Sequence, residues 1–156
     1  MLRISKLADY GTVVMVYLAK RAQTVCNARD IALHTHLTMP TVSKLLKRLT
    51  AAGLLTSVRG VNGGYRLRRL ASEISVAQII AALEEQLGLT ECSLHPNECS
   101  LQEVCDVQGN WRVISQAIET ALDSVSLEVL AKPTLKSVAI ERIRQLASGV
   151  NHGEKQ

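Results

Sequence analysis

The chain has 156 residues, a formal net charge of +4 and 47% hydrophobic residues, of which very few are aromatic. No apolar run is long enough to cross a membrane, and Arg3, Lys6 and Asp9 interrupt the N-terminal apolar stretch, which argues against a secretory signal. A cytoplasmic protein is therefore predicted. The Leu- and Ala-rich composition predicts that it is mainly α-helical, with an aliphatic core.

The charge is distributed unevenly along the chain. Residues 1–70 hold twelve Lys and Arg and two acidic residues, a balance of +10, whereas residues 71–156 hold six and twelve, a balance of −6. Such asymmetry is expected when one half faces a polyanion, although a solvated basic surface is the simpler alternative. We predict a DNA-binding unit over residues 1–70, a cysteine-bearing and dimerisation unit over 71–147, and a frayed tail over 148–156.

The first predicted element is a helix over residues 4–20, where apolar residues recur at helical spacing. Tyr10, Val13 and Tyr17 widen its apolar face, so the helix needs contacts on two sides, one of which a second chain could provide.

Two shorter helices follow, separated by a tight turn. Asn27 caps the first, over residues 28–36, and Pro40 begins the second, which Gly53 ends. The second helix has an apolar stripe, formed by Val42, Leu45, Leu46 and Leu49. Its other side presents polar and basic candidates for DNA contact together with Pro40, namely Thr41, Ser43, Lys44, Lys47 and Arg48. This is the helix-turn-helix plan, in which the second helix enters the major groove.

A β-hairpin is predicted directly after the second helix. The sequence pattern is typical of β-strands over residues 54–58 and 65–68, and a glycine-rich turn is predicted to join them. Such a hairpin is a wing, and its glycines allow the backbone to approach DNA closely. The candidate contacts in the wing are Arg59, Gly60, Gly63, Gly64 and Tyr65.

The second half is predicted to contain three more helices. One opens at Ser72 or Ser75 and ends near Gly88, and another begins after Gly109. The latter carries apolar residues at steps of three or four, which are Trp111, Ile114, Ile118, Leu122, Val125 and Val129. So long a stripe favours a dimerisation helix, with packing on its own domain as the alternative. Pro133 breaks this helix, and a last one is predicted from Thr134.

Three of the four cysteines lie close together between these helices. Cys92, Cys99 and Cys105 follow the pattern Cys-x6-Cys-x5-Cys in a segment with few apolar residues. Clustered cysteines in a cytosolic protein indicate a metal or redox site, and soft thiolates suit iron–sulfur clusters or zinc. The close pairs usual in zinc sites are missing, which favours a cluster over zinc. Unconnected surface cysteines are the alternative, and the isolated Cys26 is predicted to be a small core residue.

The combination of these features resembles a known family. The wing sequence Arg59-Gly60-x-x-Gly63-Gly64-Tyr65-x-Leu67, the spaced cysteines and the opening segment from Leu2 to Gly11 are similar to the iron–sulfur winged-helix regulators that include IscR and NsrR, above all to the branch that regulates the SUF cluster-assembly operon. The resemblance covers about residues 2–130. It implies a homodimer with crossed long helices, in which each cysteine loop lies near the partner's DNA-binding unit.

The resemblance also implies an iron–sulfur cluster with two or four irons, held by Cys92, Cys99 and Cys105. IscR-like members use a histidine three residues after the last cysteine as the fourth ligand, but Gln108 occupies that position here. NsrR-like members use an aspartate in the first helix of the other subunit, and Asp9 stands at that position. Asp9 is therefore the expected ligand, with Glu91 and His95 as alternatives.

The predicted function is a repressor-type transcription factor that binds a partly palindromic duplex and senses cluster status, oxygen, nitric oxide or iron. One alternative keeps the DNA binding but uses the cysteines as a thiol switch or zinc site. Another is an iron–sulfur carrier or redox protein. The sequence has no phosphate-binding loop, catalytic-triad spacing or paired carboxylates in an apolar setting, so an enzyme is not expected.

Overall fold

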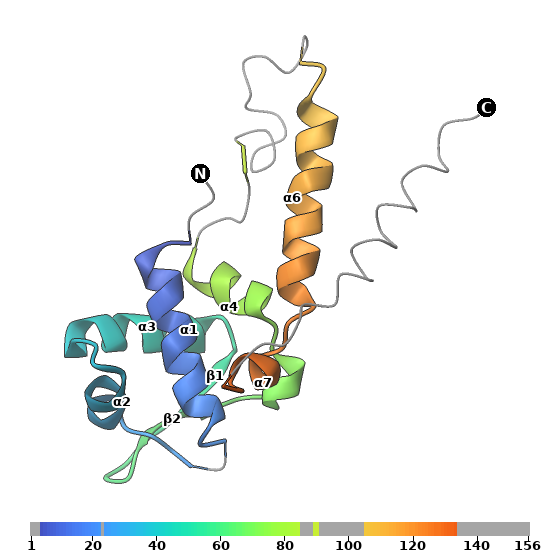
Figure 1. The fold of residues 1–156 in the computed structure, drawn as a ribbon. Coiled ribbons are helices and arrows are strands. Elements are labelled where there is room, and N and C mark those ends of the chain that lie inside the picture. Colours follow the sequence, from blue (N-terminus) through green and yellow to red (C-terminus); the bar gives the residue numbers. More distant parts are fainter. Residues whose placement is uncertain (1–3, 23, 85–88, 91–104, 134–156) are drawn as a thin grey trace.

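The computed structural model describes residues 4–22, 24–84, 89–90 and 105–133, and Figure 1 shows a body from which one long helix extends. The elements in order are α1 (Lys6–Ala19), α2 (Ala28–Thr35), α3 (Met39–Ala51), β1 (Leu55–Val58), β2 (Gly64–Leu67), the 3-10 turn η1 (Ala71–Glu73), α4 (Val76–Leu83), α6 (Gln108–Asp123) and α7 (Leu127–Leu130). The mainly α-helical winged helix-turn-helix predicted from the sequence is confirmed.

Side-chain caps explain where several helices begin. The Asn27 side chain accepts a 2.8 Å hydrogen bond from the Asp30 N–H and so begins α2, as predicted. Ser75, rather than Ser72, begins α4, because its hydroxyl and the side chain of Gln78 form a reciprocal capping box. At the other end of α2, His36 adopts the left-handed conformation with φ of 56° and stops the helix.

The core lies between the helix-turn-helix and the elements that follow the wing. All four apolar positions of the α3 stripe are completely buried, as are Ile31 of α2 and Val14 and Met15 of α1. Burying one such side chain stabilises a protein by about 1.5–3 kcal/mol, so this stripe holds α3 firmly in place. The same core includes Ile79 of α4 and Leu127 of α7, so it contains residues from both sides of the domain boundary predicted at residue 70.

Helix α1 packs most closely on α4. A Cβ added at Gly11 would collide with the Cδ1 atom of Leu83, so the missing side chain lets the two helices approach. The wide apolar face predicted for this helix is only partly covered. Tyr10 and Tyr17 pack against the core, whereas Val13 remains 42% exposed and Ile4, before the helix, 54% exposed.

The predicted long helix is shorter than expected. Gly109 lies inside α6, and α6 ends at Asp123, so the prediction of one continuous apolar stripe to Val129 is wrong. The chain leaves the helix because its backbone pairs with the segment before α4. The Val76 N–H donates to the Val125 carbonyl at 2.9 Å, and the Leu127 N–H donates to the Ile74 carbonyl at 2.7 Å.

Several predictions fall outside the described residues. The helix expected from Thr134 and the tail over 148–156 both do so. The prediction that the earlier helix ends near Gly88 is wrong, because α4 ends at Leu83, where the backbone of Glu84 is extended. Over the ranges that the structure covers, no helix combines the length and hydropathy needed to cross a membrane.

Candidate nucleic-acid interface

One face of α3 is free to meet a ligand. Ser43, Lys44 and Lys47 are exposed on the side opposite the buried stripe, and Pro40 is exposed at the beginning of the helix. The Thr38 and Thr41 hydroxyl oxygens lie 2.9 Å apart in the first turn, which has no acidic residue. Together with the positive end of the helix dipole, these side chains make the start of α3 a favourable surface for phosphate and base edges.

Arg48 differs from the other predicted contacts of α3. It is half-buried, and its Nη1 atom donates a 2.7 Å hydrogen bond to the main-chain carbonyl of Leu83 at the end of α4. The guanidinium is therefore engaged inside the protein, and we assign it a structural role rather than a DNA contact.

The wing is a short antiparallel hairpin. Leu55 pairs with Leu67 at its base and Val58 with Gly64 near its tip. A turn closes the tip, in which the Gly63 N–H donates to the Gly60 carbonyl at 2.9 Å, and Gly60 has φ of 116°. Arg59 is exposed next to this turn. The glycines are thus needed for the turn itself.

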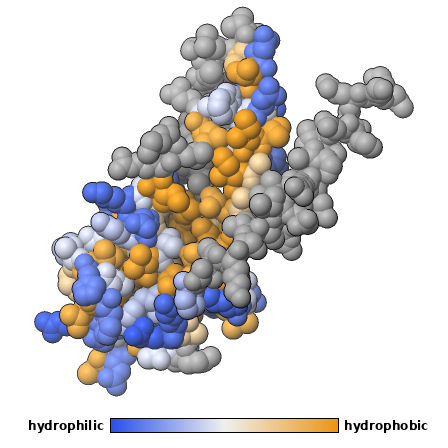
Figure 2. All heavy atoms as spheres, in the orientation of Figure 1, coloured by the Kyte–Doolittle hydropathy of each residue, from blue (hydrophilic) through white to orange (hydrophobic). Residues whose placement is uncertain are grey.

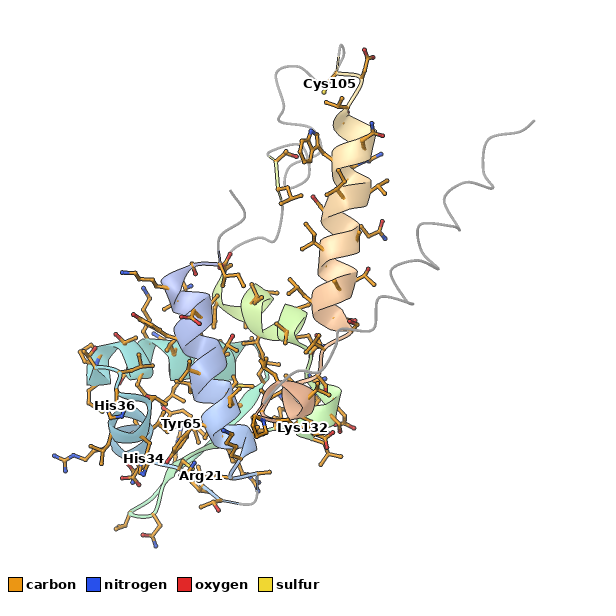
Figure 3. All side chains as sticks on the ribbon, in the orientation of Figure 1. Arg21, His34, His36, Tyr65, Cys105 and Lys132 are labelled. Carbon is orange, nitrogen blue, oxygen red and sulfur yellow. The ribbon has the colours of Figure 1, made fainter. Side chains whose placement is uncertain are left out.

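The start of strand β2 is attached to the segment before α2. Cys26 and Tyr65 exchange two main-chain hydrogen bonds of 3.0 and 2.8 Å. A Cβ at Gly64 would collide with the Cys26 carbonyl, so only glycine allows this approach. The Tyr65 ring packs against the core (Figure 3). Gly64 and Tyr65 therefore position the wing at the start of β2, and Arg59, Gly60 and Gly63 lie in or next to the turn at its tip. The pairing of Cys26 left no signal in the sequence.

A polar cluster joins the C-terminal end of α1 to α2. The Arg21 guanidinium lies 4.0 Å from the centre of the Tyr17 ring, and the Tyr17 hydroxyl lies 3.5 Å from His34 Nδ1 (Figure 3). That Nδ1 is also 2.8 Å from the Asp30 carbonyl oxygen, so His34 has a packing role. Burial raises the pKa of the Tyr17 hydroxyl, although the Arg21 charge opposes this.

The proposed metal ligands are only partly described. Cys92 and Cys99 lie outside the described residues; Cys105 is a half-buried free thiol at the tip of α6 (Figure 3). Asp9 is exposed in the first turn of α1, within the body. Since α6 extends about 24 Å, the fold does not bring these two residues together in one chain. Among the described residues, no three His, Cys, Asp or Glu side chains form a metal-binding group.

Helix α6 presents a largely uncovered apolar surface. None of its residues is fully buried, and Trp111, Val113 and Ile114 are 39%, 45% and 44% exposed. Figure 2 shows hydrophobic side chains running along this helix and down onto the body. A helix with such a face needs a partner surface, because exposed apolar patches of this kind mark interaction sites.

Known proteins share this architecture. A family model described as an iron-dependent transcriptional regulator, Rrf2, matches residues 4–133. The chain is 33% identical over 132 residues to the HTH-type transcriptional regulator IscR of Xenorhabdus nematophila, covering 84% of this chain and 80% of that protein. It is 30% identical over 145 residues to the regulator NsrR of Geobacillus kaustophilus, covering 90% and 99%.

A solved structure agrees with these relatives. The structure of CymR (YrzC), the global cysteine regulator of B. subtilis, superposes with a TM-score of 0.69 at 31% identity, covering 86% of this chain and 99% of that one. The family match, the regulators of similar sequence and the winged helix lead to one conclusion: the chain belongs to the Rrf2 family of DNA-binding transcriptional regulators.

Proposed function

We propose that the protein is a homodimer that binds a partly palindromic operator and adjusts this binding through an iron–sulfur cluster held by its cysteine segment. The observation that carries the proposal is the attachment of the end of α4 to both α1 and α3. The described residues of α4 stop at Leu83, eight residues before the segment that begins at Glu91 and contains the first clustered cysteine.

DNA binding follows from the exposed face of α3 and the wing. Lys44 and Lys47 stand on one side of a helix whose other side is fixed in the core, so they can contact the major groove without disturbing the fold. Thr41 and Ser43 lie on the same helix and can reach bases or phosphates, and Arg59 extends the basic surface to the flanking minor groove.

The homodimer follows from α6. Its exposed apolar residues are suited to a second copy of the same helix, because a two-fold pair buries the same stripe on both chains. Two winged helices related in this way would read a partly palindromic site.

The cysteine segment provides the sensor. Cys92, Cys99 and Cys105 supply soft thiolate donors, which fit an iron–sulfur cluster, and Cys105 is a free thiol at the tip of α6. When bound, such a cluster offers a centre that oxygen, nitric oxide or iron starvation can destroy. We propose Asp9 of the partner subunit as the fourth ligand, because Asp9 lies on α1, apart from Cys105 at the tip of α6 in the same chain, and because the resemblance to NsrR-like regulators implies an aspartate from the other subunit. A carboxylate is a weaker ligand for iron than a thiolate, so this bond would be lost first.

The path from sensor to DNA runs through the end of α4. The side chain of Glu84 accepts a 2.9 Å hydrogen bond from the Ser5 N–H at the start of α1, and the Leu83 carbonyl accepts one from Arg48 of α3. A change in the cysteine segment that displaces these two residues would therefore move both the helix that carries Asp9 and the helix that reads DNA.

The test combines spectroscopy with DNA binding. Protein purified without oxygen should be coloured and contain iron and sulfide in equal amounts. Asp9→Ala should shorten the lifetime of the visible absorption in air and change the affinity for a selected operator, whereas Asp123→Ala, which removes an exposed acid from the other end of α6, should change neither. Unchanged lifetime and affinity in Asp9→Ala would remove Asp9 from the mechanism.

A thiol switch is the second candidate, because one solved structure of similar fold is an oxidized form of CymR from Staphylococcus aureus. In that case the purified protein is colourless, and oxidation of the thiols alone changes the affinity for DNA. The same preparation distinguishes the two candidates.

A further inference from the structure

The tip of the wing carries an apolar side chain that the fold does not use. Val61 is 106% exposed, the highest value among the exposed large hydrophobic side chains of the described residues, where the next is Leu33 at 70%. It occupies a turn position, where Gly, Pro, Asn, Asp and Ser are usual. Because the side chain buries no surface, its presence there adds nothing to the stability of the hairpin.

The direction of this side chain is set by a rigid turn. Val61 and Asn62 are the two central residues of the turn closed by the hydrogen bond between the Gly63 N–H and the Gly60 carbonyl. A Cβ at Gly63 would collide with the carbonyl oxygens of Val58 and Gly60, so the turn is as tight as the backbone allows. Since the pairing of Cys26 with Tyr65 holds β2 close to the turn, the wing presents Val61 at its tip in a fixed position.

The surroundings of Val61 match a narrow, negatively charged groove. Arg59 and Asn62 are exposed on either side of it, and the turn from residue 59 to 64 contains no acidic residue. A cation attracted to the narrow minor groove would bring the tip with it. The floor of that groove carries only acceptors at A·T pairs, whereas a G·C pair adds the guanine N2 amino group. An apolar side chain pressed against that amino group would remove its water and offer no acceptor in return.

We propose that Val61 is a specificity-determining residue, which enters the minor groove beside the site read by α3 and excludes G·C pairs there. This inference rests on the proposed DNA binding and adds to it a sequence preference at positions where the wing makes no hydrogen bond to a base. Exclusion of a G·C pair requires only that the isopropyl group of Val61 contacts the guanine N2 amino group.

The test uses base analogues in an operator obtained from a duplex library with random positions, with the full-length protein purified without oxygen. Each flanking base pair is replaced in turn by A·T, G·C or inosine·C, since inosine lacks the N2 amino group but keeps the major-groove face of guanine. We expect one flanking position on each side where G·C binds about tenfold more weakly than A·T, and where inosine·C binds like A·T.

The protein variants then assign this difference to one side chain. Val61→Ser should bind the G·C and inosine·C duplexes equally at that position, whereas Lys47→Ala should weaken binding to all three duplexes by the same factor. Equal affinity of the wild type for inosine·C and G·C, or a G·C penalty that persists in Val61→Ser, would overturn the role of Val61 while DNA binding stands. A library that yields no bound duplex would overturn the proposed function as well.

Discussion

The Nη1 atom of Arg48 donates a 2.7 Å hydrogen bond to the carbonyl oxygen of Leu83, and this contact joins α3, the helix that we propose contacts DNA, to the last residue of α4. A cation at this place is favourable because the carbonyls at the end of a helix lack partners within it. The side chain of Leu83 is also central, since it is 2% exposed and packs against Gly11 of α1. One residue thus contacts both helices that the proposed mechanism must move.

Arg48 and Lys47 are adjacent in the sequence but should behave oppositely. Arg48→Ala removes the half-buried bond to Leu83 and should lower the free energy of unfolding by about 1–2 kcal/mol. Lys47→Ala should leave stability within about 0.5 kcal/mol but weaken DNA binding and reduce the slope of log Kd against log salt by about one for each lysine removed, hence by about two for the proposed homodimer. Urea denaturation and fluorescence anisotropy over a salt series measure the two effects. A reduced salt slope in Arg48→Ala would show that this residue contacts phosphate after all.

Gly11 should be intolerant of a side chain. Alanine is the better helix former by about 1 kcal/mol, but the added Cβ would meet Leu83 in a closed core, and such overpacking costs about 1–3 kcal/mol. We therefore expect Gly11→Ala to lower the midpoint of urea denaturation. Gly109→Ala is the matched control, because it lies in helix α6 with nothing within 4 Å of the new Cβ. Gly109→Ala should raise the midpoint of urea denaturation slightly or leave it unchanged. A lower midpoint in both variants would contradict the packing explanation.

The dimer should depend on the exposed apolar residues of α6. Ile114→Asp places a charge in the proposed seam, where an unpaired charge is strongly unfavourable, so the protein should sediment as a monomer at micromolar concentrations and lose most of its affinity for the operator. Gln116→Asp, on the same helix and also exposed, should remain a dimer. A dimeric Ile114→Asp protein would show that another surface forms the interface.

Cys26 should be chemically inert in the folded protein. Burial raises the pKa of its thiol, and the side chain is only 5% exposed. In a variant with the other three cysteines replaced by serine, alkylation at about pH 8 should proceed only at the rate of unfolding.

The raised pKa of Cys26 also makes a contribution to stability that depends on pH. The thiol ionises more readily in the unfolded chain, so this contribution is complete below the unfolded pKa of about 8.5 and is lost as the pH rises toward the folded value. Cys26→Ala should therefore lose less stability than the parent protein between about pH 8 and 10. If both proteins lost the same amount of stability over this pH range, the raised pKa of the Cys26 thiol would be contradicted.

The sequence by itself determined the winged helix-turn-helix. Its main features depend on residues that lie close together in the sequence, so each leaves a local pattern that can be read without coordinates. These features are the apolar stripe of α3, the cap at Asn27 and the glycines of the wing. The charge asymmetry and the spaced cysteines are equally visible in the sequence, and they led to the proposal of a DNA-binding sensor.

Only the tertiary structure decided where the long apolar stripe breaks and what Arg48 does. The stripe ends at Asp123 because residues 125–127 pair with residues 74–76, and Arg48 turns inward because the end of α4 offers the carbonyl of Leu83 as an acceptor. The Cys26 pairing that positions the wing is of the same kind. Every residue except proline carries the same main-chain N–H and C=O groups, so hydrogen bonds that these groups make between distant segments leave no pattern in the sequence of side chains.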